Sequence, residues 1–431
     1  MITTIRLEQS ECAASARAFP STTRYRGDNP PMQLAARRIT ALQERLRPLM
    51  DFLGHSEYAR RSGDPDVADF VLGNPQEMPL QGLVDAVQHH AVPQNKNWFA
   101  YAFHNHASAE VVARSLGAST GLPFEADDVL FAPGTFGGLA TALRGLVDPG
   151  DEVIFISPPW FFYESMIEVL GATPVRVKLQ APRFRLDADA IRAAITPRTR
   201  AVLVNSPQNP TGHVYTQEEL NALADVLNAA SSEAAARQKP PIVLISDESY
   251  NRVLFDGRTF VSPAVAYPHT FVLYTYGKQL LAPGERIGYI AMSPRIEGRA
   301  ELRESLRFSQ IVGGWQIPNN TLMRAIPDLE AISIDVGAIQ RRRDRLHAEL
   351  TRMGYEVMCP EATFYMMVRS PMADEWAFVD RLAQHNVFVG PGAIFEMPGY
   401  FRISMTASDE MVTRALPGFK AAITSANSAR P

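Results

Sequence analysis

Cysteine is scarce in this sequence, since only Cys12 and Cys359 occur among 431 residues. Two cysteines cannot form the disulfide framework of a small secreted protein, so the composition favours a reducing compartment, the cytoplasm. Long hydrophobic runs are also missing, because no apolar stretch approaches the roughly 20 residues of a membrane-spanning helix. Residues 1–19 lack the apolar centre of a secretory signal. These absences argue against a membrane protein and against an exported one.

An excess of charge of one sign is missing as well, because 42 lysines and arginines oppose 46 aspartates and glutamates. No basic run with interleaved aromatic residues occurs, so we predict no nucleic-acid partner. His104 and His106, in the stretch FHNHAS, are the pair that most resembles a metal site. Two histidines without a third ligand are more often ordinary loop residues, so we predict no metal.

Apolar residues make up 46% of the chain, which is ample for a large core. From about residue 80 to residue 292, strand-like and helix-like segments alternate with short connections. This alternation predicts an α/β fold with a mostly parallel sheet between helices. The predicted strands are 128–132, 151–157, 199–207, 241–246, 270–275 and 287–292, and the predicted helices are 134–146, 160–172 and 216–230.

The ends of the chain have a different pattern. Residues 32–53 have helical spacing of apolar residues, and residues 67–80 predict a short strand followed by a turn. The polar segment 231–241 predicts an exposed loop. Beyond about residue 295 the pattern changes to long helices and an α+β arrangement. We therefore predict an N-terminal extension (1–35), the N-terminal part of a small domain (36–80), a large ligand-binding domain (81–305) and a C-terminal small domain (306–431).

Polar residues follow several of the predicted strands. Asp247 follows the strand 241–246, Lys278 follows 270–275, Asn209 follows 199–207 and Thr135 follows 128–132. Ligands of open α/β sheets bind outside the carboxyl ends of the strands. Asp247 alone could be an ordinary turn cap, and Lys278 alone a solvated surface lysine. Together they suit pyridoxal phosphate, which needs a lysine for an imine, a carboxylate at its ring nitrogen and an anion site for its phosphate.

Four motifs support this interpretation in their order along the chain. They are NSPQNPTG (205–212), SDESY (246–250), YTYGKQLLAPGERIGY (274–289) and YFRIS (400–404). The sequence from about residue 70 onward resembles the class I/II aminotransferases, pyridoxal-phosphate enzymes of fold type I in the aspartate aminotransferase-like superfamily. The resemblance implies a large domain with a mostly parallel sheet sandwiched by helices and a smaller α+β domain.

The resemblance also implies roles for individual residues. Lys278 would bind the cofactor covalently and move the substrate Cα proton, while Asp247 would hold the ring nitrogen protonated. Tyr250 and Asn209 would bond the ring oxygen, and Trp160 would stack on the ring, although core packing is the alternative for Trp160. Further positions that match the family are Gly134, Thr135 and Phe136 with Thr275 and Arg286 for the phosphate, and Arg402, Gly73 and Asn209 for the substrate.

Two departures from the family pattern stand out. Gly277 occupies the position before the lysine where the family usually has serine. Residues 101–116 lack the usual glycine and proline of a segment near the shared active site, and Tyr101 matches the family tyrosine only within a residue. We therefore expect the segment His104–His106 to shape the substrate pocket of a specialised branch.

The resemblance implies an aminotransferase that acts on an L-amino acid through an external aldimine and a Cα carbanion, with a keto acid as acceptor. One alternative is β- or γ-elimination or replacement, as in 1-aminocyclopropane-1-carboxylate synthases that use S-adenosylmethionine. Another is oxidation or hydroxylation of an amino acid. A third is a binding module without turnover, against which the retained Lys278 argues. The family also implies a homodimer whose active sites share residues across the interface.

Overall fold

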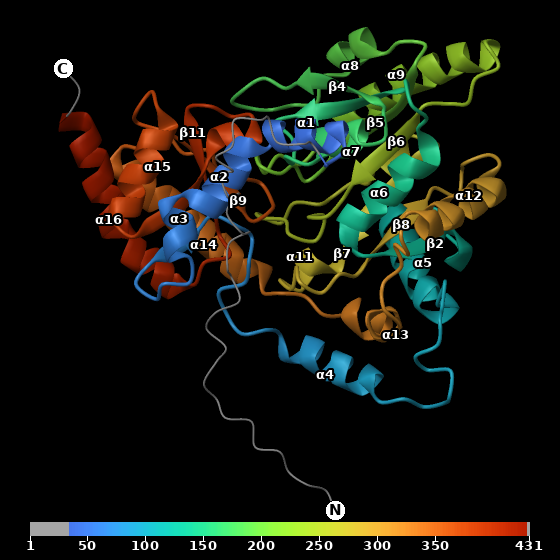
Figure 1. Ribbon diagram of the computed structural model, residues 1–431, viewed down its shortest axis with the longest axis horizontal. Helices are drawn as coiled ribbons and strands as arrows, with labels where there is room; N and C mark the ends of the chain where they lie inside the picture. Colours follow the sequence, from blue (N-terminus) through green and yellow to red (C-terminus); the bar gives the residue numbers. More distant parts are fainter. Residues whose placement is uncertain (1–33, 429–431) are drawn as a thin grey trace, which may run out of the picture.

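Two β-sheets organise the computed structural model, which describes residues 34–428. In Figure 1 the larger sheet and its helices lie to the right, and the smaller sheet with the orange and red C-terminal helices lies to the left. The larger sheet has seven strands in the order β2-β8-β7-β6-β5-β3-β4. Its strands are β2 (Val129–Ala132), β3 (Glu152–Ser157), β4 (Thr173–Lys178), β5 (Thr199–Asn205), β6 (Val243–Asp247), β7 (Thr270–Thr275) and β8 (Gly288–Met292).

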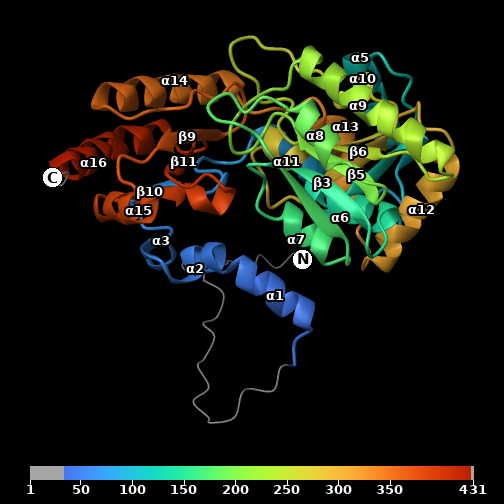
Figure 2. The same ribbon diagram turned by 90° about the horizontal axis from the view of Figure 1, so that it is seen from above.

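The larger sheet is mostly parallel, which confirms the predicted fold class. Strands β4, β3, β5, β6 and β7 pair in parallel, and only β8 runs antiparallel to its neighbours β7 and β2. Its faces are covered by different helices, as Figure 2 shows for α6 (Gly134–Leu146) and α9 (Gln217–Ala236). On β3, Phe155 packs in a cluster with α6, while its neighbour Ile154 packs in a cluster with α9. This alternation follows from the two-residue period of a strand.

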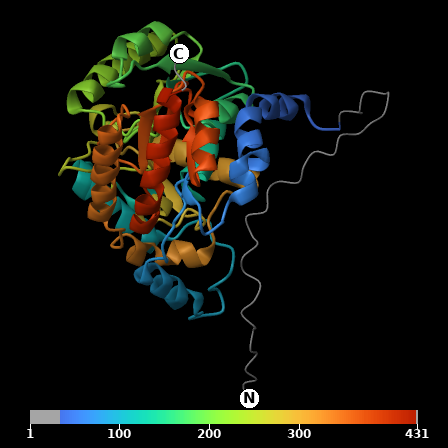
Figure 3. The ribbon, with the colours of Figure 1, turned by 90° about the vertical axis from the view of Figure 1, so that its left-hand side faces the viewer.

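The smaller sheet has the order β1-β10-β11-β9, with β1 parallel to β10 and the other pairs antiparallel. Its strands are β1 (Ala68–Phe70), β9 (Tyr365–Arg369), β10 (Val387–Pro391) and β11 (Tyr400–Ser404). Helices α14 (Val336–Met353), α15 (Glu375–Gln384) and α16 (Asp409–Ser428) cover it, and Figure 3 shows these orange and red helices side by side. Strand β1 therefore brings the N-terminal region to the C-terminal sheet.

The remaining helices are short or lie at the edges. They are α1 (Arg37–Arg45), α2 (Arg47–His55), α3 (Glu57–Arg61), α4 (Gln81–Ala91), α5 (His106–Thr120), α7 (Tyr163–Glu168), α8 (Ala188–Ala194), α10 (Pro263–Ala266), α11 (Tyr276–Gln279), α12 (Arg299–Val312) and α13 (Asn320–Leu329), with 3-10 helices at Ala126–Asp128 and Gly392–Phe395. Within residues 34–428, none of the helices has the length and apolar character to cross a membrane.

The predicted domain limits stay a prediction, and the extension 1–35 lies almost wholly outside the described residues. Helix α12 spans the predicted limit at residue 305 and packs against α6, and α13 packs against α4 and α5. Both helices therefore lie against the larger sheet's helical layer rather than against the smaller sheet.

Several element predictions were wrong in detail. The predicted helix 32–53 is two helices that meet at Leu46, because Pro48 cannot donate to residue 44 and its ring would clash with that carbonyl group. Helix α9 continues to Ala236 through part of the predicted loop 231–241, since alanine and glutamate are strong helix formers. The edge strand β4 was missed, and the predicted helix 160–172 is helical only from Tyr163 to Glu168.

The register of the larger sheet aligns the ends of three strands. Asn205 at the end of β5 lies beside Asp247 at the end of β6, and Asp247 lies beside Leu273 near the end of β7. The segments that follow these strands, with Asn209, Tyr250 and Lys278, therefore leave the sheet along one edge. Parallel pairing is the reason, because it gathers carboxyl ends on the same side.

Candidate active site

A cavity opens at this edge of the larger sheet. Its volume is about 640 Å³ with the open solvent at its mouth included, which is the size of a cofactor or small-ligand site. Of the predicted site residues, the cavity brings together Thr135, Phe136, Trp160, Asn209, Asp247, Tyr250, Thr275, Lys278 and Arg286. The other lining residues are Tyr163, Asn205, Ser249, Gly277, Pro283 and Tyr365.

Asp247 is a buried carboxylate in this cavity with donors on both oxygens. The Ser249 hydroxyl donates to Oδ1 over 2.6 Å, and the Tyr163 hydroxyl donates to Oδ2 over 2.6 Å. Burial raises the pKa of Asp247, whereas these two hydrogen bonds and the charge of Lys278 act in the opposite direction. A protonated ring nitrogen would supply the positive charge that such a buried carboxylate needs.

Lys278 lies in α11, with its Nζ 5.6 Å from the centre of the Tyr250 ring. The Tyr250 hydroxyl donates to the Tyr365 hydroxyl over 3.3 Å. Burial alone would raise the pKa of Tyr365, but the positive charges of Lys278 and Arg402 outweigh it and hold that pKa below its usual value. Burial raises the pKa of Tyr250 well above its usual value. Tyr250 therefore stays a donor next to Lys278.

One end of the cavity is built for an anion. Helix α6 begins at Gly134, and the N–H groups of its first turn have no partner within the helix. Gly134 has a φ of +69°, and a Cβ at this position would lie 2.6 Å from Nη2 of Arg286 and 3.2 Å from Oγ1 of Thr275. Glycine therefore lets the loop, the arginine and the threonine approach closely, and the donors suit a phosphate.

Gly277, which replaces the usual serine, also lines the cavity. A Cβ at this position would lie 3.2 Å from the Cα of Pro283 and 3.3 Å from the carbonyl oxygen of Ala282. The segment after the lysine thus folds back too closely for a side chain to enter without a shift.

Arg402 lies behind Asn209 at the other end of the site. Its Nη1 donates to Asn209 Oδ1 over 3.2 Å, and its Nη2 donates to the Val71 carbonyl oxygen over 2.9 Å. Its Nε is buried and has no hydrogen-bond partner among residues 34–428. Gly73 borders the same corner, because a Cβ there would lie 2.6 Å from the Tyr365 hydroxyl. The unpaired Nε and the fork geometry suit a carboxylate ligand.

Trp160 belongs to the cavity wall and also packs with other aromatic rings. Its ring is perpendicular to that of Phe136 at 4.9 Å and contacts Phe162 at 5.2 Å. Phe136 is 42% exposed, so its ring faces the open part of the cavity while its backbone lies in the first turn of α6. The aromatic packing expected as the alternative is present, and stacking of Trp160 on the cofactor ring stays a prediction.

The segment His104–His106 does not line the cavity, contrary to our expectation. His104 stacks on Phe131 of β2 at 6.1 Å, Asn105 caps α5, and His106 pairs with Glu110. Tyr101 is 90% exposed and lies against Trp315. Among residues 34–428, no group of three histidine, cysteine, aspartate or glutamate side chains is arranged to hold a metal ion.

Sequence reasoning missed the residues that support the predicted ones. Tyr163 was not among the predicted site residues, yet its hydroxyl donates to Asp247. Ser249 lies within the SDESY motif and also bonds Thr135 over 2.8 Å. No sequence motif indicated Tyr365, which begins strand β9 of the smaller sheet.

The donor set fits pyridoxal phosphate. The cavity has a lysine, a buried carboxylate, a tyrosine donor, and a helix N-terminus with an arginine at one end. A side chain at position 134 would fill the space beside Arg286 and Thr275. The buried Nε of Arg402 has no hydrogen-bond acceptor among residues 34–428. These are the groups that the ring nitrogen, ring oxygen, phosphate and substrate carboxylate require.

Known proteins are similar to this chain in sequence and in fold. The family model "Aminotransferase class I and II" matches residues 65–419. The aspartate/prephenate aminotransferase of Thermus thermophilus is 32% identical over 370 residues, which cover 84% of this chain and 91% of that protein. A probable N-succinyldiaminopimelate aminotransferase of Mycobacterium tuberculosis is 33% identical over 245 residues, which cover 56% of this chain and 58% of the relative.

Solved structures agree with these matches. An aminotransferase from Eubacterium rectale has a TM-score of 0.82 at 28% identity, covering 92% of this chain and all of that one. The aspartate aminotransferase of Thermus thermophilus with maleate has a TM-score of 0.74 at 28% identity, covering 91% of this chain and all of that one.

Proposed function

Because this chain belongs to the class I and II aminotransferases, we propose that it uses pyridoxal phosphate to transfer the amino group of an L-amino acid to a keto acid. The observation that carries the proposal is one cavity that is lined by Lys278 and Asp247, has an anion site at one end, and is lined elsewhere by Asn209, which accepts a hydrogen bond from a buried arginine. Arg286 marks the anion site, and Arg402 is bonded to Asn209 at the other end. Arg286 would face the cofactor phosphate, and Arg402 would face the substrate carboxylate.

The chain offers three places that would hold the cofactor. Asp247 would pair with the ring nitrogen, Tyr250 and Asn209 would donate to the ring oxygen, and the first turn of α6 with Thr275 and Arg286 would bind the phosphate. Ser249 and Tyr163 support Asp247 from behind, and both bonds favour its ionised form. When bound, pyridoxal phosphate withdraws electrons from the substrate Cα and so makes its proton acidic.

The remaining steps belong to the side chains. Arg402 binds the substrate α-carboxylate and Gly73 offers a backbone group beside it, so the Cα–H bond is fixed in orientation. Nζ of Lys278 takes the proton from Cα and later donates it on the cofactor side. The same residues accept a keto acid in the second half of the reaction, which returns the enzyme to its starting form.

The proposal also includes a specialised metabolic role, a homodimer and a cytoplasmic location. The specialised role rests on Gly277, which lines the cavity. The exposed aromatic side chains Tyr101, Phe103 and Trp315 support a homodimer. The centre of the Trp315 ring lies 5.4 Å from that of Tyr101 and 4.9 Å from that of Phe103. Exposed aromatic side chains of this kind are typical of interfaces. The cytoplasm stays the predicted location.

The test is a spectrum of the purified protein before and after addition of single amino acids, with mass spectrometry of the products. We expect a visible absorption band that is lost in Lys278→Ala, and the appearance of pyridoxamine phosphate with a keto acid in the wild type. A fragmented substrate would instead indicate elimination or replacement, and consumption of oxygen would indicate oxidation or hydroxylation. A band that survives Lys278→Ala unchanged would contradict the proposed role of the lysine.

A further inference from the structure

A network of hydrogen bonds holds α11, the short helix that carries Lys278. At the start of this helix, the Tyr276 hydroxyl donates to Oε2 of Glu330 over 2.5 Å. At its end, the carbonyl oxygen of Gln279 accepts a hydrogen bond of 2.9 Å from the N–H of Ile334. Glu330 follows the last residue of α13, so both ends of α11 are fastened to the end of α13 and the segment after it.

Arg252 joins the same network to Tyr250. Its Nη1 donates to Oε1 of Gln279 over 2.8 Å, and its Nη2 donates to Oε1 of Glu330. Arg252 also lies inside a tight turn, because the N–H of Val253 donates to the Tyr250 carbonyl oxygen over 2.9 Å. A displacement of Arg252 would therefore move the backbone of Tyr250 as well.

The ion pair of Arg252 and Glu330 is largely shielded from water. The two side chains are 27% and 12% exposed, and the guanidinium carbon lies 4.9 Å from the centre of the Tyr274 ring. Tyr274, Tyr276 and Tyr289 also face the pair, and they stay neutral because burial raises the pKa of each. Loss of one partner would leave the other charge unpaired and away from water, which is strongly unfavourable. The pair therefore keeps its geometry.

We propose that Arg252 and Glu330 are positioning residues, which set the placement of Lys278 against Tyr250. The inference rests on the proposed amino transfer, in which Lys278 moves the substrate proton. Nζ of Lys278 lies 5.6 Å from the centre of the Tyr250 ring, yet the two residues follow different strands, β7 and β6. Arg252 and Glu330 are not among the residues that line the cavity, so their effect on the reaction passes through Lys278 and Tyr250. Proton transfer depends steeply on such placement.

The first experiment compares the wild-type holoenzyme with Glu330→Gln and Arg252→Met by the pH midpoint of the visible absorption change. As a donor to the cofactor ring oxygen, the Tyr250 hydroxyl would stabilise the charged form of that oxygen and favour loss of the proton from the Lys278 nitrogen. A displaced Tyr250 should therefore raise the midpoint in both variants, by about 0.5 pH unit or more. A direct charge effect would instead move it in opposite directions, because one variant removes a negative charge and the other a positive one.

Asp256→Asn is the matched control. Asp256 pairs with the buried Arg343 over 2.6 Å, and the guanidinium carbon of Arg343 likewise lies 4.9 Å from the centre of an aromatic ring, that of Phe255. This pair also lies outside the cavity lining, so its loss should leave the midpoint unchanged. Arg252→Lys keeps the positive charge without the planar fork of donors, so it should raise the midpoint less than Arg252→Met does.

The second experiment mixes each holoenzyme with L-alanine, L-aspartate, L-glutamate or L-phenylalanine, carrying hydrogen or deuterium at Cα, and follows the loss of the visible band. We expect Glu330→Gln to lower the rate constant about tenfold or more and to enlarge the isotope effect, because proton transfer becomes the slow step. A variant that is only less stable would lose active enzyme without a change in the isotope effect.

Opposite shifts of the midpoint in Glu330→Gln and Arg252→Met, shifts equal to that of Asp256→Asn, or an unchanged isotope effect would overturn the inference. Shifts in the same direction, without reaction of any of the four amino acids, would overturn the proposed function and support the positioning of Lys278 and Tyr250.

Discussion

The Tyr163 hydroxyl donates a hydrogen bond of 2.6 Å to Oδ2 of Asp247, joining α7 to the end of β6. The bond favours the ionised carboxylate, so its loss in Tyr163→Phe would raise the pKa of Asp247 further. A neutral Asp247 cannot hold the ring nitrogen protonated. We expect the dissociation constant of pyridoxal phosphate to rise about tenfold, the effect of one hydrogen bond to a charged group. Equilibrium dialysis of the cofactor measures it.

Tyr215→Phe is the control for this substitution. The Tyr215 side chain is also buried, but its hydroxyl has no hydrogen-bond partner among residues 34–428. Its removal should leave cofactor affinity unchanged. Equal losses in the two variants would mean that Tyr163 acts through packing and not through Asp247.

Gly134→Ala should weaken cofactor binding by closing the anion cradle. The added Cβ would meet Arg286 at 2.6 Å and Thr275 at 3.2 Å. Gly121→Ala is a matched control, because Gly121 has a similar φ of +73° and nothing within 4 Å of its Cβ position. Both variants should lose about 1 kcal/mol of unfolding free energy from backbone strain. Only Gly134→Ala should raise the cofactor dissociation constant, and an equal rise in both would contradict the cradle.

Tyr365→Phe should change the pH response of the bound cofactor. Lys278 and Arg402 hold the pKa of Tyr365 below its usual value, so the Tyr365 oxygen in turn stabilises positive charge at the lysine. Without it, the pH midpoint of the visible absorption change should move to lower values. A spectrophotometric titration measures the shift. Tyr355→Phe, which alters a buried tyrosine bonded to the Phe419 carbonyl, should leave the midpoint in place.

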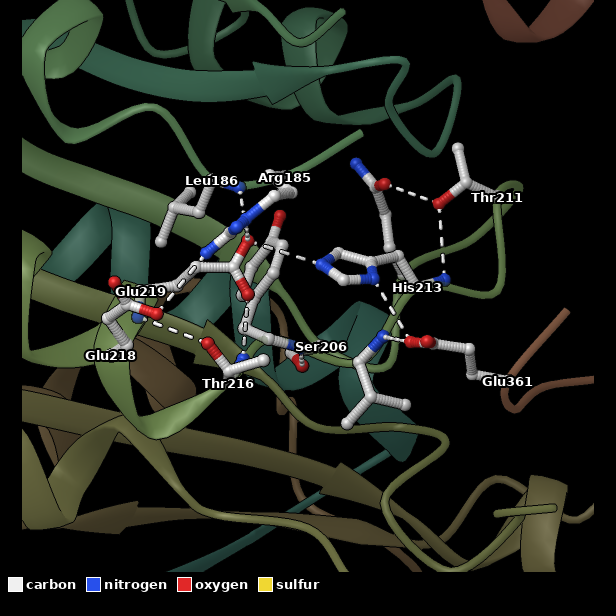
Figure 4. Close-up of polar contacts among 12 residues, drawn as sticks. Arg185, Leu186, Ser206, Thr211, His213, Thr216, Glu218, Glu219 and Glu361 are labelled. Atoms are coloured by element: carbon white, nitrogen blue, oxygen red, sulfur yellow. Dashed lines mark hydrogen bonds and ion pairs between the residues drawn. The ribbon is translucent and has the colours of Figure 1, made fainter. Parts of the chain in front are cut away.

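His213 links helix α9, which covers the larger sheet, to the segment before strand β9 of the smaller sheet through a charged cluster (Figure 4). It contacts Glu219 at the start of α9 over 3.2 Å and Glu361, which precedes β9, over 3.0 Å. Although burial opposes it, these two carboxylates raise the pKa of His213 to about 9. Arg185 and Arg258 also contact these two glutamates. The cluster is therefore held together by a protonated histidine.

The sign of its effect on stability follows from the raised pKa. The folded-state pKa of about 9 lies above the ordinary histidine pKa of 6.5, so the stabilisation is complete below the unfolded-state pKa and is lost as the pH rises through about 9. His213→Gln should lower the free energy of unfolding by roughly 2 kcal/mol at pH 6, and the difference from wild type should vanish at high pH. Urea unfolding across this range tests it. The exposed pair of His55 and Asp51 provides the control, since His55→Gln should have little effect at any pH.

Local sequence patterns predicted the sheet and the chemical groups of the site. Strand–helix alternation indicated a parallel sheet, and parallel pairing places the ends of successive strands on one edge. This is why Asp247, Lys278 and Asn209 could be assigned to one site before any distance was known. The errors in element boundaries came from single residues or short runs. Pro48 divides one predicted helix, and the alanines up to Ala236 extend another.

The supporting contacts could not be read in the same way, because they join residues far apart in the chain. Tyr163 and Asp247 are separated by 84 residues, and Tyr250 and Tyr365 by 115. Nothing in the sequence around Tyr365 indicates that β9 brings it next to Lys278. The position of His104–His106 beside β2, rather than in the cavity, likewise depends on the packing of α5.

The sequence by itself determined the fold class, the family and the set of side chains at the strand ends, because these depend on periodicity and on motifs of a few residues. The tertiary structure alone decided which groups flank Asp247 and that Arg402 lies between the Tyr365 and Phe395 rings. Contacts across two sheets are set by how whole layers pack, and no short stretch of sequence contains that information.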